Sequence, residues 1–582
     1  MKFEVWGPTP DRVELLFRGE RLEMRRDDRG WWRRDVSDAE PAERYAFSLD
    51  GGPPRPDPRS NDQPDGVHES SRIVDHDAFA WKHPTFRAPS LASGAVYELH
   101  IGTFTPEGTF DAAIDKLDHL VDLGVTHVEI MPINAFEGER GWGYDGVCWY
   151  APHRAYTGAD GPDAVKRFVD ACHARDLAVI LDVVYNHLGP SGNYLREWGP
   201  YFSDAYATPW GDAMNLDGPG SDETRSYMID NALMWLRDYR FDGLRLDAVH
   251  AFHDRSSVHI LESLNAAVRE LERSQGRPLT LIAESDLNDP RLVRSIEAAG
   301  YGLDAQWSDD FHHALHALLT GERSGYYVDD GSVERLGDAW RHGFTFRGGY
   351  SAFRGRSHGR SADGIPPTRL LGYAQDHDQI GNRATGDRLT HLVESRQLEV
   401  AAALVLLAPF VPMLFQGEEW GSNGVFQYFT DHQDPALAEA VRQGRRREFA
   451  DAVGSADEVP DPQDRATFER SKLDWSERDA SVHAALLEWH KKLIGFRRRH
   501  LAHLSDPLGA IDVAWSESPA WIRSRRGDVV LAFSLGAQPT TIPLRGDGDA
   551  AYDIILSNDR EAKVPDESLR LRGWSVAALV TS

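Results

Sequence analysis

Cysteine is scarce in this chain: Cys148 and Cys172 are the only two among 582 residues. Two cysteines are too few for a disulfide framework. Apolar residues make up 41% of the chain and include 17 tryptophans, which is ample for a packed core. Cys172 shares a helical spacing with Val165, Phe168 and Val169, so we expect it to lie in that core.

Long apolar segments are also missing. No apolar run reaches the roughly 18 residues that a membrane-spanning helix requires. The opening residues 1–6, M-K-F-E-V-W, do not contain the apolar stretch of a signal peptide. We therefore expect a soluble, cytoplasmic protein.

Positive charge is in short supply. The chain has 64 Lys and Arg against 92 Asp and Glu, which gives a net charge of −28. Such a balance argues against nucleic acid or an anionic membrane as a partner, and it fits a neutral or cationic ligand.

Eight short apolar runs recur between residues 95 and 418, with helical patterns such as 163–175 and 224–239 between several of them. The runs are 95–100, 125–133, 177–184, 243–249, 279–284, 303–307, 370–378 and 411–418. Eight strand–helix units in one stretch favour a closed (β/α)8 TIM barrel over an open doubly wound sheet. The long insertions after the third and sixth runs are expected to be loops on the catalytic face.

Segments with alternating apolar and polar residues flank the barrel. They predict that residues 1–90 hold an N-terminal β-sandwich of a carbohydrate-binding type and a linker. The proline-rich segment 51–66 belongs to this linker. The catalytic barrel is expected to span 91–503 and to end with an amphipathic helix at 481–500. Alternation returns in 504–582, which predicts a C-terminal all-β domain.

Polar clusters end four of the runs, at 182–187, 245–247, 284–286 and 375–379. Barrel active sites are built at this end of the strands. Arg245 and Asp247 are two residues apart, so both point to the same side of a strand, and the guanidinium favours an ionised carboxylate. A capping or salt-bridge role could explain any one cluster. Four at the same end of one architecture favour a catalytic site.

Four strings resemble the conserved regions of the α-amylase superfamily of glycoside hydrolases. They are D-V-V-Y-N-H at 182–187, G-L-R-L-D-A-V-H at 243–250, A-E-S-D at 283–286 and D-H-D-Q at 376–379. Longer strings are similar to the subfamily that releases trehalose from maltooligosyl trehalose, and they lie at 54–68, 98–110, 131–147, 283–291, 376–383 and 426–432. This resemblance implies hydrolysis of the α-1,4-glucosidic bond next to the terminal trehalose. It also implies a maltooligosaccharide-type substrate that ends in trehalose, and no cofactor.

The resemblance assigns Asp247 as the nucleophile, Glu284 as the general acid/base and Asp378 as the carboxylate that stabilises the transition state. A retaining glycosidase needs one ionised carboxylate to attack the anomeric carbon and one protonated carboxyl to protonate the leaving oxygen. Burial and the neighbouring Asp247 and Asp378 should therefore raise the pKa of Glu284, while Arg245 keeps Asp247 charged.

Substrate-binding residues follow from the same resemblance. His187 and His377 match histidines that hydrogen-bond the hydroxyls of the sugar being cleaved. Trp142, Tyr144 and Asp145 match a loop that lines this sugar, and Tyr144 is expected to stack on it because aromatic faces suit the apolar faces of sugar rings.

Two positions leave alternatives open. Asn186 could be a calcium ligand, but without a convincing second set of oxygen ligands a hydrogen-bonding role is favoured, and we expect no metal site. Asp376 stands where most of the superfamily has asparagine. It adds a carboxylate that we expect outside the immediate contact shell of the sugar.

Inserted loops could shape the subsites for the leaving group, although exposed loop aromatics are as often packing residues. The candidates are Trp210, Tyr326, Phe353 and Arg354, together with Glu418 and Glu419 after the eighth run. Rival interpretations are a glycogen-branching or debranching enzyme and an inactive glycan-binding relative. An inactive relative should have lost a catalytic position, whereas this chain retains Arg245, Asp247, Glu284 and Asp378.

Overall fold

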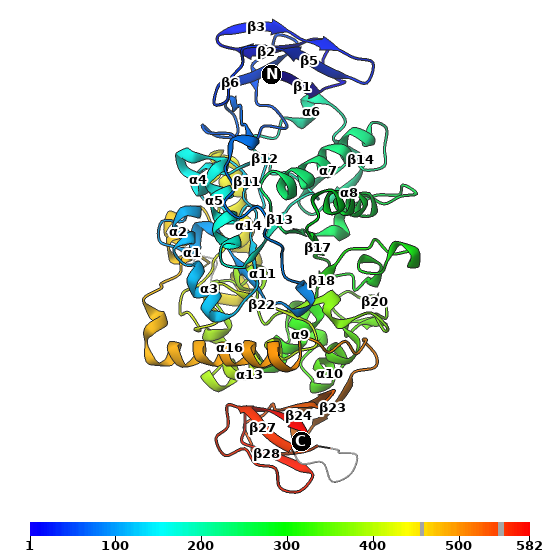
Figure 1. The fold of residues 1–582 in the computed structure, drawn as a ribbon, viewed down its shortest axis with the longest axis vertical. Coiled ribbons are helices and arrows are strands. Elements are labelled where there is room, and N and C mark those ends of the chain that lie inside the picture. Colours follow the sequence, from blue (N-terminus) through cyan, green and yellow to red (C-terminus); the bar gives the residue numbers. More distant parts are fainter. Residues whose placement is uncertain (454–458, 545–551, 582) are drawn as a thin grey trace.

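Eight parallel strands close into a barrel in the middle of the molecule (Figure 1). The structure, a computed structural model, describes residues 1–453, 459–544 and 552–581. In order around the barrel the strands are β9 (Val96–Leu99), β10 (His127–Ile130), β13 (Ala178–Val183), β16 (Gly243–Leu246), β17 (Thr280–Ala283), β18 (Ala305–Trp307), β21 (Leu370–Gly372) and β22 (Val411–Phe415). Each strand falls within one of the eight predicted runs, so the prediction of a (β/α)8 barrel is confirmed.

Helices surround the barrel, and their ends follow from local sequence. Helix α8 (Ile260–Gln275) shows how: the His259 side chain accepts a hydrogen bond from the N–H of Leu261, and Gly276 ends the helix in the left-handed conformation. Other long helices include α5 (Pro162–His173), α7 (Ser221–Arg237), α9 (Asp309–Thr320), α10 (Val333–His342), α13 (Ser395–Leu406) and α16 (Ser481–His500). The last of these spans the residues predicted for the final amphipathic helix.

Two small antiparallel sheets lie at one end of the molecule (Figure 1). One contains β1 (Lys2–Trp6), β5 (Trp31–Asp35) and β4 (Arg25–Arg26). The other contains β3 (Glu20–Glu23), β2 (Val13–Phe17), β6 (Arg44–Leu49), β7 (Pro54–Arg55) and β8 (Ser71–Arg72). In β1, the buried Phe3 and Val5 alternate with the exposed Lys2 and Glu4, as expected of a strand with one face in a core.

These N-terminal sheets pack against the insertion that follows β13. The short helix α6 (Leu195–Trp198) ends in the fully buried Trp198, whose carbonyl accepts a hydrogen bond from Thr9 N at 3.1 Å. The rings of Trp6 and Tyr201 meet edge to face with centroids 5.0 Å apart. Aromatic burial thus joins the sheets to the barrel.

The C-terminal sheets lie at the opposite end of the molecule (Figure 1). The larger sheet has the order β23 (Asp512–Glu517), β24 (Ala520–Arg526), β25 (Val529–Ser534), β29 (Ser575–Thr581), β27 (Tyr552–Ser557), and β26 (Thr540–Pro543) pairs with β28 (Ser568–Leu571). Helix α10 packs on β23, where the Arg341 guanidinium lies 5.0 Å from the ring centroid of Trp515.

Three long insertions follow strands β13, β18 and β22. They carry the hairpin β14–β15 (Phe202–Thr208 and Gly211–Met214), the hairpin β19–β20 (Arg347–Ser351 and Arg356–Gly359) and helix α14 (Pro435–Val453). The first two insertions were predicted. The insertion after β22 was not singled out from the sequence.

Both cysteines are free thiols inside the protein. Cys172 is fully buried in α5, which confirms its predicted place in the core, and Cys148 in β12 (Cys148–Pro152) is 5% exposed. Within the described residues, no helix combines the length and apolar character needed to cross a membrane.

Candidate active site

A cavity of about 550 Å³ contains the three predicted carboxylates. Asp247 follows β16, Glu284 follows β17, and Asp378 lies in helix α11 (His377–Gly381) just after β21. The lining also includes Trp142, Tyr144, Asp145, His187, Trp210, Asp286, Asn382, Tyr428, Arg445 and Glu448. Side chains from separate barrel strands therefore converge on one space.

Asp247 is held by two donors. Nη1 of the fully buried Arg245 lies 2.8 Å from Asp247 Oδ1, and Asn186 Nδ2 donates to Oδ2 at 2.7 Å. The carboxylate is thus paired with a cation and fixed in orientation. Asn186 takes the hydrogen-bonding role that the sequence favoured over calcium binding.

Glu284 lies in a different electrostatic environment. Burial raises the pKa of its carboxyl well above the usual value, and the nearby Asp247 adds to this effect although Arg245 opposes it. Arg245 Nη2 is 3.6 Å from Glu284 Oε2, and the backbone N–H of Ala248 donates to the same oxygen at 2.6 Å. Ala248 has a φ of 41°, a left-handed conformation that is unusual for a residue with a side chain and occurs most often at functional sites.

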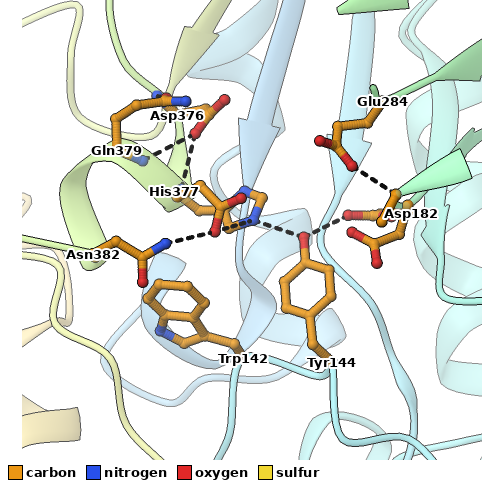
Figure 2. A network of polar contacts seen from close by, with 12 residues as sticks. Trp142, Tyr144, Asp182, Glu284, Asp376, His377, Gln379 and Asn382 are labelled. Atoms are coloured by element: carbon orange, nitrogen blue, oxygen red, sulfur yellow. Dashed lines mark hydrogen bonds and ion pairs between the residues drawn. The ribbon is translucent and has the colours of Figure 1, made fainter. Parts of the chain in front are cut away.

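Asp378 occupies the first turn of α11, and Asp376 caps that helix. Asp376 Oδ1 accepts hydrogen bonds from the N–H groups of Asp378 and Gln379 at 2.8 and 3.3 Å, and the Gln379 side chain binds back to Asp376 N at 3.1 Å (Figure 2). This is a capping box. Asp376 does not line the cavity, so its carboxylate positions the helix. Asn382 Nδ2 donates to Asp378 Oδ1 at 3.2 Å.

Tyr144 links the two sides of the site (Figure 2). Its hydroxyl donates to Asp182 Oδ2 at 2.7 Å and lies 2.8 Å from His377 Nε2. Asp182 also receives Arg245 Nη1 at 2.7 Å, while burial raises the Asp182 pKa to about 6. The Tyr144 ring stacks on His377 and also faces the cavity, which is compatible with the predicted contact with sugar.

His187 and Trp210 form one wall of the cavity. Their rings stack with centroids 5.7 Å apart, and His187 Nε2 lies 3.0 Å from the carbonyl oxygen of Tyr144. Trp210 is 47% exposed in the turn of the β14–β15 hairpin. Asp145 also lines the cavity, and its Oδ2 is 4.0 Å from His432 Nε2.

The other predicted loop residues form a cluster beside the cavity, outside its lining. Arg354 Nη2 donates to Asp286 Oδ2 at 2.9 Å, and Asp286 itself lines the cavity. The Phe353 ring is 6.2 Å from that of Tyr326, which stacks on His313. The ion pair between Arg354 and Asp286 therefore connects this cluster to the cavity.

Glu418 and Glu419 do not line the cavity. Glu419 is fully buried and interacts with His119 Nε2 at 2.7 Å and with the Tyr97 hydroxyl at 3.0 Å. Glu418 Oε2 accepts a hydrogen bond from Phe415 N at 3.2 Å. Glu419 is used to pack the end of β22, so the suggestion that it shapes a subsite is wrong, whereas Glu418 is half-buried and its suggested role stays a prediction.

Several residues of the site were missed from the sequence. Asp182 stands in the string D-V-V-Y-N-H, and its place at a strand end was the available signal. Glu98 on β9 contacts His377, but no charged partner stands near it in the sequence. Arg445 comes from α14, in a segment that carries no motif.

A (β/α)8 barrel with an arginine-paired carboxylate and a buried carboxyl of raised pKa at its strand ends defines a glycoside hydrolase of the α-amylase class. The family model of the alpha amylase catalytic domain matches residues 61–207. Malto-oligosyltrehalose trehalohydrolase from Arthrobacter ramosus is 52% identical over 559 residues, covering 95% of this chain and 96% of the relative. The enzyme of that name from Mycobacterium tuberculosis is 48% identical over 585 residues, covering 98% of both. The chain belongs to the malto-oligosyltrehalose trehalohydrolase family.

Solved structures share the fold of this chain. A crystal structure from Salmonella typhimurium, described as an alpha amylase, is 37% identical and superposes with a TM-score of 0.91 over 100% of this chain and 97% of that one. A pullulanase from Anoxybacillus sp. LM18-11 is 18% identical with a TM-score of 0.74, over 100% of this chain and 86% of that one, which is a likeness of fold alone.

Proposed function

We propose that this glycoside hydrolase cleaves the α-1,4-glucosidic bond next to the terminal trehalose of maltooligosyl trehalose and releases trehalose with retention of configuration. The observation that supports this proposal is that Asp247 and Glu284 both contact the Arg245 guanidinium but lie in different electrostatic environments. Arg245 pairs directly with Asp247, whereas Glu284 is buried with a raised pKa. A retaining enzyme needs this combination of an ionised nucleophile and a protonated acid.

In the proposed reaction, Asp247 attacks the anomeric carbon while Glu284 transfers its proton to the leaving oxygen. The bond to trehalose breaks, and a covalent glycosyl ester forms on Asp247. The ionised Glu284 then removes a proton from water, which attacks the same carbon and frees Asp247. Asp378 stabilises the positive charge that develops on the sugar ring in both steps. Side chains carry every step, so we propose that no cofactor is required.

The surrounding residues divide between the two halves of the substrate. Tyr144, Asp145 and His187 line the space next to Asp247 and Asp378, and we assign them to the sugar that is attacked. Arg245 and His377 are buried behind this lining, bound to Asp247 and to Tyr144, and we assign them to the same sugar.

For the leaving trehalose we assign Trp210, Tyr326, Phe353 and Arg354. Trp210 lines the cavity, and the Arg354–Asp286 ion pair joins the cluster of Tyr326, Phe353 and Arg354 to the cavity that contains Glu284, the group that protonates the leaving oxygen. Exposed aromatic faces at Trp210 and Phe353 suit the apolar faces of two more sugar rings.

Product analysis tests the proposal. The protein is incubated with maltooligosyl trehalose and separately with plain maltooligosaccharides of equal length, and the products are separated by chromatography. We expect free trehalose and a shortened maltooligosaccharide from the first substrate, with much slower cleavage of the second. Proton NMR at early times should show the new reducing end in the α configuration. Branched transfer products would indicate a branching enzyme, and binding without turnover would indicate an inactive relative.

We place the enzyme in the cytoplasm. Its two buried, unpaired thiols suit a reducing compartment, and its strongly acidic composition suits a neutral glucan better than a polyanion.

A further inference from the structure

Glu98 forms two hydrogen bonds with His377. Glu98 lies in β9 with its side chain inside the barrel, and its Oε1 is 2.5 Å from His377 Nδ1. Its Oε2 accepts the backbone N–H of His377 at 3.2 Å. The side chains are 2% and 1% exposed, so no water competes for these bonds. Glu98 therefore fixes the ring of His377 and the start of α11 together.

The second ring nitrogen reveals the charge of His377. Nε2 lies 2.8 Å from the Tyr144 hydroxyl, and that hydroxyl gives its proton to Asp182 (Figure 2). The Tyr144 oxygen can therefore only accept a hydrogen bond from Nε2. Because Nδ1 faces a carboxylate, this geometry matches a ring that carries a proton on both nitrogens. Burial lowers the pKa of His377, but the neighbouring Glu98 and Asp378 outweigh it and raise that pKa to about 10.

A neighbouring acid shows that Glu98 has a distinct role. Glu129 on β10 stands in register with Glu98, and it is equally buried at 1% exposure. Neither oxygen of Glu129 has a hydrogen-bond partner within the described part of the chain. Burial, aided by nearby Glu98, raises the Glu129 pKa well above its usual value, whereas Glu98 is paired with His377.

We infer that Glu98 is a positioning residue that holds His377 as an imidazolium beside the transition-state carboxylate Asp378. This inference rests on the proposed function. His377 Nε2 is 3.6 Å from Asp378 Oδ1, so His377 is paired with Asp378 as Arg245 is paired with Asp247. Glu284, which must keep its proton, shares the Arg245 guanidinium at the longer distance of 3.6 Å. The titratable and charged groups around the imidazolium are Glu98, His100, Glu129, Tyr144, Asp182, Arg245, Asp376 and Asp378.

The test compares Glu98→Gln with the matched control Glu129→Gln. Both replace a buried barrel carboxyl by an amide of the same shape, but only Glu98 contacts His377. His377→Gln and the double variant E98Q/H377Q complete a cycle. The rate constant kcat/KM is measured from pH 5 to 10 with maltooligosyl trehalose and with α-maltosyl fluoride. Fluoride leaves without a proton, so loss of the proton from Glu284 does not hide titration of His377.

We expect E98Q to lose on the order of 100-fold in kcat/KM on both substrates, as for loss of one preorganised electrostatic contact. We expect E129Q to match the wild type. Without its carboxylate partner, His377 should lose its proton at lower pH, so the activity of E98Q on the fluoride should decline on the alkaline side about one pH unit or more below that of the wild type. The double variant should be no slower than H377Q.

Three results would overturn the inference: additive losses in the double variant, an equal loss in E129Q, or an E98Q activity profile that keeps the wild-type pH dependence. If E98Q does not fold, Glu98→Asp keeps the charge at a changed distance and should retain the alkaline limb of the wild type with lower kcat. A wild-type protein inactive on both substrates would contradict the proposed function itself, and this is a separate outcome.

Discussion

Arg245 is fully buried, and its guanidinium is in contact with three carboxyl groups, those of Asp182, Asp247 and Glu284. The Cζ atom of this guanidinium also lies 4.3 Å from the ring centroid of Trp307. A lysine has a single compact charge and cannot serve these separate oxygens at once. The planar fork of arginine therefore allows one cation to organise the acids of the site.

The roles of the two principal acids predict the effect of removing them. Asp247→Ala removes the nucleophile, and Glu284→Gln removes the transferable proton while keeping the shape of the side chain. Each should lower kcat on maltooligosyl trehalose by roughly four or more orders of magnitude. Steady-state kinetics provides the measurement, and thermal unfolding is the control for an intact fold. Near-normal turnover by either variant would show that the assigned roles are wrong.

The raised pKa of Glu284 predicts the direction of the alkaline limb of the pH profile. The protonated carboxyl is the active form, so kcat/KM for maltooligosyl trehalose should fall as pH rises through the pKa of Glu284. Because burial moves this pKa well above 4.5, activity should persist at pH values where an exposed glutamate is already ionised. The residual activity of E284Q should lack this limb. A wild-type profile that instead falls as pH increases between 4 and 5 would contradict the assignment.

At the level of residues, sequence could predict those groups whose partner lies close in the chain. Arg245 and Asp247 share one face of a strand, and their contact at 2.8 Å follows from that spacing. The Glu98–His377 pair joins residues 279 positions apart, and only closure of the barrel between β22 and β9 brings them together. No local pattern carries that information.

Helix α11 presents Asp378, and its cap is the element-level feature that fixes the position of this carboxylate. Asp376→Ala removes the acceptor for two N–H groups and should lower the stability of the protein by about 1 kcal/mol and reduce kcat. Asp376→Asn keeps an acceptor at the same place and should retain both stability and activity. Denaturant unfolding and kinetics on the two variants provide the comparison. Equal damage by both substitutions would show that the charge of Asp376, and not its capping, is required.

Helix α14 contributes Arg445 to the cavity from far along the chain. Its Nη2 donates to the Gly381 carbonyl at 2.8 Å and its Nη1 to Asn382 Oδ1 at 3.2 Å, and Asn382 in turn donates to Asp378. Arg445→Ala should therefore loosen Asp378 and lower kcat/KM about tenfold. Arg447 is exposed on the same helix, so Arg447→Ala is the matched control and should leave kinetics unchanged. If both variants behave alike, α14 has no specific role in placing Asp378.

The elements of the barrel were predictable because buried parallel strands are short apolar runs and their crossover helices are amphipathic. Helix α14 was not predicted, because its sequence P-A-L-A-E-A-V-R-Q-G-R-R-R-E-F-A-D-A-V has few large apolar residues at helical spacing. Its position is set by contacts such as the Arg445 guanidinium over the ring of Tyr428 at 5.0 Å. Such tertiary contacts leave no mark in the local pattern of apolar residues.

At the scale of the whole molecule, aromatic contacts join the N-terminal sheets to the barrel. We expect a substitution at these contacts to lower the stability of the protein without changing its catalytic rate. Trp6 is 5% exposed, meets Tyr201 edge to face, and donates from Nε1 to the Arg29 carbonyl at 3.1 Å. Trp6→Ala should cost about 3–5 kcal/mol at this junction and lower the midpoint of thermal unfolding. At 25 °C the kcat on maltooligosyl trehalose should stay at the wild-type value. A matching loss of kcat would mean that the sheets reach the substrate.

The inaccessible thiols make the protein a convenient background for site-specific labelling. Only a thiolate reacts readily with maleimides, and burial raises the Cys148 pKa to about 12 and that of Cys172 well above its usual value. A single cysteine placed on the surface at Tyr350, which is 67% exposed in the β19–β20 hairpin, would then be the one reactive position in the folded protein. A fluorophore attached there would report on the arrival and departure of trehalose without replacement of either native cysteine.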